Sequence, residues 1–113
     1  MAKEWTIVEH QEYKRTIRLV PKHIREEVEN SLRPQMEDYP FINDANKRPL
    51  KNECEGFYEQ KIEKYRLVFR ILNYNSKIVE FSWIRAKPHA TSKRWVASIT
   101  SHYTRQAKHQ TLL

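Results

Sequence analysis

Two pairs of charged side chains, each pair sharing a parity within its own segment, stand on two neighbouring segments that we predict to be strands. Arg66 and Arg70 alternate with apolar residues in one segment. Glu59 and Lys61 alternate in the same way in the segment before it. Because successive side chains of a strand point to opposite faces, we expect all four on one open face of a sheet.

Such a face carries groups that can cleave RNA without a metal ion. One group removes the proton of a 2′-hydroxyl, cations stabilise the charge on the phosphorane, and another group protonates the leaving 5′-oxygen. Arg and Lys suit the second task, and His, Glu or Tyr could transfer the protons. Tyr58, Trp83 and Trp95 could stack unpaired bases. The alternative is a strand whose solvent side is charged only for solubility.

Other catalytic signals are absent from the sequence. It contains no G-x-S-x-G, no Gly-rich phosphate loop and no H-E-x-x-H. The five histidines do not stand at metal-ligand spacing, so we expect neither a metal nor a cofactor. Cys54 has no spacing that suggests a Cys–His pair and is interpreted as a loop or filler residue.

The positive charge is concentrated at the C-terminal end of the chain. Residues 1–84 hold 15 Lys or Arg against 14 Asp or Glu, whereas residues 85–113 hold six basic residues and no acidic one. This asymmetry favours an anionic partner: nucleic acid first, then an acidic protein or a membrane surface. The alternative is a solvated basic tail. The cations that we expect to bind RNA are Lys47, Arg48, Lys51, Arg70, Lys87, Lys93 and Arg94.

The elements that must position these residues form an antiparallel meander. Strands are predicted at 57–62, 65–72 and 77–85, with a polar turn at 73–76 between the last two. Their apolar rows are expected to be buried on one face. The side chains predicted to be buried there are Leu67, Phe69, Phe81 and Trp83, packed against Ile17, Val20, Ile24 and Val28.

A short strand and two helices precede the meander. The strand is predicted at 4–9, and apolar residues at helical spacing then indicate one helix before Pro21 and a second helix after it. Pro34 is expected to end or kink the second helix. Residues 40–51 are predicted to be a loop, and residues 93–108 a closing helix. The order β-αα-βββ-α belongs to the α+β class.

The length of 113 residues indicates a single domain over residues 1–113, with a basic extension from about residue 90. A single cysteine suits a reducing compartment. We find neither an apolar run long enough for a membrane span nor the start of a signal peptide, so a cytoplasmic location without a membrane partner is expected.

Three short motifs give the central stretch a resemblance to a known family. They are Pro49-Leu50-Lys51, then Gly56-Phe57-Tyr58, then Tyr65-Arg66-Leu67-Val68-Phe69, followed by a hydrophobic final strand. Together they resemble the RelE/ParE superfamily of bacterial toxins, and within it the RelE and YoeB type of mRNA interferase. The resemblance implies a compact β-αα-βββ fold, cleavage of mRNA in the ribosomal A site, and a cognate antitoxin that wraps and neutralises the toxin.

The resemblance also implies roles for individual residues. Arg66 matches the family's active-site arginine, and Lys61 matches one of the RelE-type lysines, while Glu59 occupies the position of the second lysine. Arg48 stands where YoeB-like members place a catalytic glutamate, which argues against a YoeB-like base. Glu59 is the candidate base because it shares the parity of Lys61, and the alternative role is a surface salt-bridge partner. Arg85 and His89 are the candidates for the family's C-terminal arginine and its His or Tyr.

Three functions are therefore open at the level of the sequence. The first is an RNA-cleaving toxin of a type II toxin–antitoxin system. The second is a ParE-like inhibitor that binds DNA gyrase, and the third is a nucleic-acid-binding module without catalytic activity. Convergence of the candidate catalytic residues on one patch favours cleavage, and their dispersal favours binding.

Overall fold

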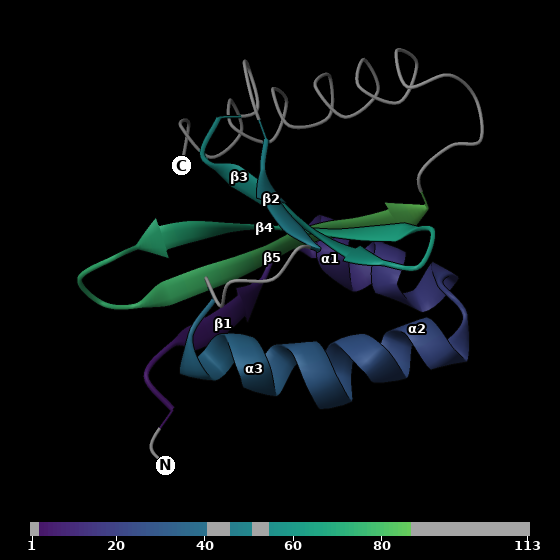
Figure 1. Ribbon diagram of the computed structural model, residues 1–113, viewed down its shortest axis with the longest axis horizontal. Helices are drawn as coiled ribbons and strands as arrows, with labels where there is room; N and C mark the ends of the chain where they lie inside the picture. The colour runs from purple at the N-terminus through teal and green to yellow at the C-terminus, as the bar shows by residue number, and fades with distance from the viewer. Residues whose placement is uncertain (1–2, 41–45, 51–54, 87–113) are drawn as a thin grey trace.

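The computed structural model describes residues 3–40, 46–50 and 55–86. The chain is an α+β domain, as predicted, and Figure 1 shows its arrangement. Its elements are β1 (Thr6–Glu9), α1 (Gln11–Thr16), the 3₁₀ turn η1 (Ile17–Leu19), α2 (Lys22–Glu27), the π-helical turn η2 (Val28–Leu32), α3 (Arg33–Asp38), β2 (Lys47–Pro49), β3 (Phe57–Ile62), β4 (Tyr65–Asn73) and β5 (Ile78–Ala86).

The strands form one five-stranded mixed sheet in the order β1-β5-β4-β3-β2 (Figure 1). The predicted antiparallel meander is confirmed as β3, β4 and β5. The N-terminal strand adds one edge by pairing parallel to β5. The opposite edge is β2, a short strand inside the segment that the sequence suggested was a loop. The predicted closing helix at 93–108 lies outside the described residues.

The helices cover one face of this sheet. The core joins apolar side chains of the helices to those of β3, β4 and β5. Its buried members are Trp5, Tyr13, Val20, Ile24, Val28, Leu32, Met36, Ile62, Leu67, Phe69, Val79, Phe81 and Ile84. Leu67, Phe69 and Phe81 are therefore buried on the predicted face.

Trp83 corrects one part of that prediction. Val68 pairs with Trp83 but Phe69 pairs with Phe81, so β5 contains one extra residue, Ser82, at a β-bulge. A bulge reverses the alternation beyond it, and Ile84 takes the core position instead. Trp83 packs on the opposite face with Val68 and Phe57.

The second helix continues past Pro34, so the expectation that the proline would end it is wrong, while the regular helix is interrupted just before it by the π turn. Helical residues run from Lys22 to Asp38, and the backbone N–H of Arg33 bonds to the carbonyl of Val28 in the wide π turn. In a regular α-helix the ring of Pro34 would clash with the carbonyl four residues earlier. The extra residue in the preceding turn accommodates the proline without ending the helix.

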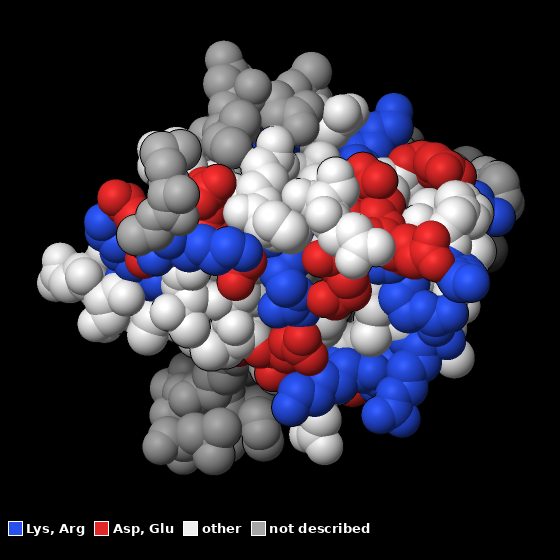
Figure 2. Space-filling model, turned by 90° about the horizontal axis from the view of Figure 1, so that it is seen from below, with Lys and Arg blue, Asp and Glu red and all other residues white. Residues whose placement is uncertain are grey.

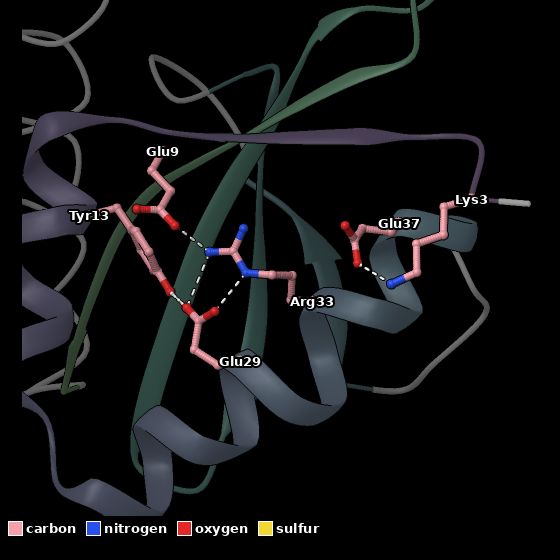
Figure 3. Close-up of polar contacts among 6 residues, drawn as sticks. All are labelled: Lys3, Glu9, Tyr13, Glu29, Arg33 and Glu37. Atoms are coloured by element: carbon pink, nitrogen blue, oxygen red, sulfur yellow. Dashed lines mark hydrogen bonds and ion pairs between the residues drawn. The ribbon is translucent and has the colours of Figure 1, made fainter.

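One polar network ties this helix to α1 and β1 (Figure 3). Arg33 donates through Nε to Glu29 Oε2 at 2.7 Å and also bonds to Glu9, while Tyr13 donates to Glu29 Oε1 at 2.8 Å. The guanidinium lies 5.1 Å from the ring centre of Phe81. Burial, reinforced by the Glu29 carboxylate, raises the pKa of Tyr13. Burial alone would raise the pKa of Glu29, but the hydrogen bonds from Arg33 and Tyr13 outweigh it and lower that pKa.

The core position of Phe69 gives a first prediction. Phe69 is completely buried, so Phe69→Ala should lower the free energy of unfolding by about 3–5 kcal/mol through lost contacts and a cavity. Leu72→Ala on the exposed end of the same strand should cost less than about 0.5 kcal/mol. Urea denaturation measures both. A loss below about 1 kcal/mol for Phe69→Ala would contradict the assignment of the buried face.

The lowered pKa of Glu29 gives a second prediction. The ionised carboxylate contributes stability above its ordinary pKa, and this contribution is lost as the pH falls through the lowered pKa. Glu29→Gln should therefore be less stable than the parent at pH 7 and should lose less further stability between pH 7 and pH 3. Glu26→Gln, at an exposed carboxylate of the same helix, is the control. If the free energies of unfolding of the parent and of Glu29→Gln changed in parallel with pH, the stability of the protein would not be linked to protonation of Glu29.

Candidate functional site

Three cations lie in one row across β3, β4 and β5. Lys61 stands directly opposite Arg66, and Arg66 stands directly opposite Arg85. Directly paired residues share a face, and their chain neighbours Leu67 and Ile84 lie in the helix-covered core. The three side chains, which we call the cation row, therefore belong to the face opposite the helices. Three of the predicted catalytic residues are brought together there.

Arg66 is held at its position by the β3–β4 turn. Its Nη1 donates to the backbone carbonyls of Glu63 at 3.0 Å and Tyr65 at 2.9 Å. The turn itself requires a positive φ of 56° at Glu63. Among the described residues these are the only hydrogen bonds of Arg66. Its Nε and Nη2 are therefore available for two oxygens of a phosphate.

The other two members of the row have different supports. The Arg85 guanidinium lies 5.1 Å from the ring centre of Trp83, a cation–π contact that orients it. Lys61 is fixed through its backbone, since its N–H bonds to the carbonyl of Asn46 at 2.7 Å. Its side chain is exposed and makes no hydrogen bond or ion pair within the described part of the chain.

Arg70 has contacts that favour a structural role over the predicted RNA contact. Its Nε lies 2.9 Å from Glu80 Oε1, which also accepts a hydrogen bond from the hydroxyl of Ser82. The guanidinium is 5.3 Å from the ring centre of Phe57. The side chains of Arg70 and Glu80 are only 19% and 8% exposed. This ion pair joins β4 to β5 on the same face as the cation row.

Glu59, the predicted general base, lies on the predicted face but not in an open position. Its side chain is 6% exposed, and its Oε1 lies 3.5 Å from the Nε of Arg48. Arg48 is 69% exposed and remains accessible to a ligand. Lys47, another predicted RNA contact, donates from Nζ to Gln35 Oε1 at 3.3 Å. Parity alone could identify the face of Glu59 but not its burial.

The remaining predicted site residues lie outside the described residues. They are His89, the predicted proton donor, and the predicted RNA contacts Lys51, Lys87, Lys93 and Arg94. Over residues 3–40, 46–50 and 55–86, no group of three or more His, Cys, Asp or Glu could hold a metal ion. Within the same ranges, no helix has the length and hydropathy needed to cross a bilayer.

Two contacts on the face of the cation row were not predicted from the sequence, the Arg70–Glu80 ion pair and the packing of Arg85 on Trp83. Once the antiparallel register of β4 and β5 is fixed, Arg70 and Glu80 stand directly opposite each other, so their pairing could be read from an aligned hairpin. Trp83 and Arg85 are two residues apart in β5, so alternation alone places them on one face; that this is the face opposite the helices depends on the bulge at Ser82.

The solved structures that resemble this fold include several proteins named as toxins. The toxin–antitoxin complex RelBE2 of Mycobacterium tuberculosis matches at 19% identity over 74% of this chain and 98% of the other, with a TM-score of 0.62. The archaeal RelE–RelB complex of Pyrococcus horikoshii matches at 15% identity, 77% and 99% coverage, and a TM-score of 0.64. A YoeB/ParE toxin of Agrobacterium tumefaciens matches at 18% identity over 71% of this chain and 95% of the other, with a TM-score of 0.61.

These similarities concern the fold, because the identities are below 20%. No protein-family model matches the chain, and no curated protein matches its sequence. The resemblance carried by the three central motifs is confirmed at the level of three-dimensional structure, over about three quarters of this chain.

The ion pair of Arg70 gives a third prediction. Arg70→Met keeps a long side chain but leaves the buried Glu80 carboxylate without its cation, which should lower the free energy of unfolding by about 3 kcal/mol. The double variant Arg70→Met/Glu80→Gln should recover part of that loss, since no buried charge remains. Chemical denaturation of the three proteins measures the effect. An unchanged stability in Arg70→Met, with weaker RNA binding, would instead support the role predicted from sequence.

Proposed function

We propose that this chain, which has the fold of the RelE/ParE toxins, is the toxin of a type II toxin–antitoxin pair and a metal-independent endoribonuclease that cleaves mRNA on the ribosome. The cation row is the observation that carries this proposal. Three cations from adjacent strands lie on one face of a rigid sheet, and one of them has two guanidinium nitrogens available for phosphate oxygens. A developing dianionic phosphorane requires such an arrangement.

The proposed reaction is an attack within the RNA strand. The 2′-oxygen attacks the adjacent phosphorus after losing its proton, the bond from phosphorus to the 5′-oxygen breaks, and that oxygen receives a proton. The products are a 2′,3′-cyclic phosphate and a 5′-hydroxyl. Arg66 binds the non-bridging oxygens through Nε and Nη2. Lys61 and Arg85 stabilise the same charge from the two neighbouring strands.

The two proton transfers are assigned to Glu59 and His89. Glu59 is the proposed base, and for this role RNA has to draw Arg48 away from its carboxylate. Arg48 is exposed, so a phosphate can replace the carboxylate as its partner. The buried Glu59 carboxylate then loses this cation, a cost that RNA binding has to offset. His89 is the proposed proton donor, an assignment that rests on sequence resemblance alone.

The proposed partners are a cognate antitoxin, mRNA and the ribosome, in the cytoplasm. The complexes named above combine a toxin with an antitoxin, and a comparable partner here would neutralise the protein by covering the cation row. An acidic segment suits that surface, since complementary charge orients and accelerates association.

The proposal predicts a large effect of one substitution. Arg66→Ala should lower the single-turnover rate of mRNA cleavage on programmed ribosomes by roughly 10²-fold, the scale for loss of one electrostatic stabiliser. Binding to ribosomes should largely persist, because the lost interaction is made mainly in the transition state. Arg18→Ala is the matched control, since Arg18 is an exposed arginine in η1.

Two outcomes would overturn this proposal. Equal cleavage by the parent and Arg66→Ala would exclude the cation row as the active site. A parent protein that cleaves no RNA but stops supercoiling by DNA gyrase would support the ParE-like function instead.

A further inference from the structure

The β3–β4 turn beside Arg66 contains a residue that does not favour its own backbone conformation. Ile62 pairs with Tyr65, so the hairpin loop consists of Glu63 and Lys64 alone. The dihedral angle φ is positive at Glu63 (56°) but not at Lys64. A two-residue loop with positive φ at its first position normally has glycine there, because in this region a Cβ crowds the following carbonyl oxygen. The turn is therefore strained at Glu63.

This strained backbone supports the central member of the cation row. The carbonyl of Glu63 accepts a hydrogen bond from Arg66 Nη1 at 3.0 Å, and the carbonyl of Tyr65 accepts from the same nitrogen at 2.9 Å. The two carbonyls converge on one nitrogen because the chain turns at Glu63. A turn of another type would rotate the first carbonyl away, and the guanidinium would keep only one of these two acceptors.

A contact with the second helix holds the same turn from outside. His23, at the start of α2, lies 3.2 Å from the carboxylate of Glu63, at a separation of 40 residues in the chain. Figure 1 shows the β3–β4 turn and the start of α2 at one end of the molecule. Both side chains are 63% exposed, so the pair adds little to the free energy of unfolding. Its effect is on the position of the turn.

The pair between His23 and Glu63 differs from a neighbouring surface pair. Figure 2 shows basic and acidic side chains interspersed on the side of the molecule seen from below. Lys22 pairs with Glu26 at 3.7 Å within a single helix. The pair of His23 joins a helix to the sheet instead, so it restrains the turn against the rest of the domain.

A second turn of the same kind stands at the opposite end of β4. Lys77 has a φ of 55°, and its Nζ lies 3.1 Å from the carboxylate of Glu4. In the described part of the chain, Glu63 and Lys77 are the two residues other than glycine with positive φ. Of these two, Glu63 is the one that bonds to a member of the cation row. Lys77 therefore serves as an internal reference for a strained turn without that contact.

Residues in such conformations persist only where the surrounding structure fixes them, and they concentrate at functional sites. We propose that Glu63 is a positioning residue for Arg66, whose guanidinium it holds in the orientation that presents Nε and Nη2 to the phosphate. The strained backbone directs the carbonyl at Nη1, and the contact with His23 keeps the turn in place. The inference rests on the proposed function and adds to it a residue that does not touch the RNA.

The test relieves the strain and measures stability and cleavage together. Glycine adopts positive φ freely, so Glu63→Gly should raise the midpoint of thermal unfolding by roughly 2–5 °C. The turn also becomes free to take other conformations, so single-turnover cleavage on programmed ribosomes should fall roughly tenfold. Lys77→Gly, the matched control, should raise the midpoint similarly and leave the rate unchanged. An unchanged rate in Glu63→Gly, or one that falls only together with the midpoint, would overturn the inference.

A double variant shows whether Glu63 acts through the guanidinium. In the Arg66→Ala background, Glu63→Gly should cause no further loss of rate, because the group that it positions is already absent. A further tenfold loss would overturn the inference, since Glu63 would then act independently of Arg66.

A spectroscopic measurement separates this inference from the catalytic proposal. The ¹⁵N order parameter of the Arg66 Nε–H bond, assigned by the loss of its signal in Arg66→Ala, needs no cleavage. It should be lower in Glu63→Gly than in the parent and unchanged in Lys77→Gly. Equal order parameters in the parent and Glu63→Gly would overturn the inference. A parent that cleaves no RNA, but whose Arg66 loosens in Glu63→Gly, would refute the enzyme and leave the positioning role intact.

Discussion

The arrangement of the domain depends on one partly buried arginine. Arg33 bonds to Glu29 on its own helix and to Glu9 at the end of β1, and its guanidinium lies over Phe81 of β5. The Arg33 side chain is only 19% exposed, so removing either carboxylate would leave this cation with fewer partners in a poorly solvated position. The network therefore fixes the orientation of the helix against the sheet.

The pattern of the sequence was sufficient for the parts of the fold that depend on local periodicity. Strict alternation identified β3, β4 and β5, and helical spacing identified two helices. The predictions from this pattern were wrong where one extra residue interrupts the regular period of a strand or a helix. The bulge at Ser82 moved Trp83 to the other face, and the π turn before Pro34 let the helix continue. The short strand β2 carried too few residues for an alternation to be recognised.

The candidate site was predictable to a similar extent. Parity was enough to predict that Lys61 and Arg66 lie on the open face, because alternation within a single strand determines which of its side chains share a face. The burial of Glu59 and the pairing of Arg70 depend on neighbouring strands and on their register, which a single strand does not reveal.

The parallel pairing of β1 with β5 has a consequence for the order of events during synthesis. The first strand leaves the ribosome early, but its partner is the last described strand, so contacts of long sequence separation complete the sheet. Arg85 is carried by the same late strand. A nascent chain can therefore neither bury its core nor assemble the cation row until β5 has been translated. Incomplete chains that lack β5 would therefore lack the proposed activity.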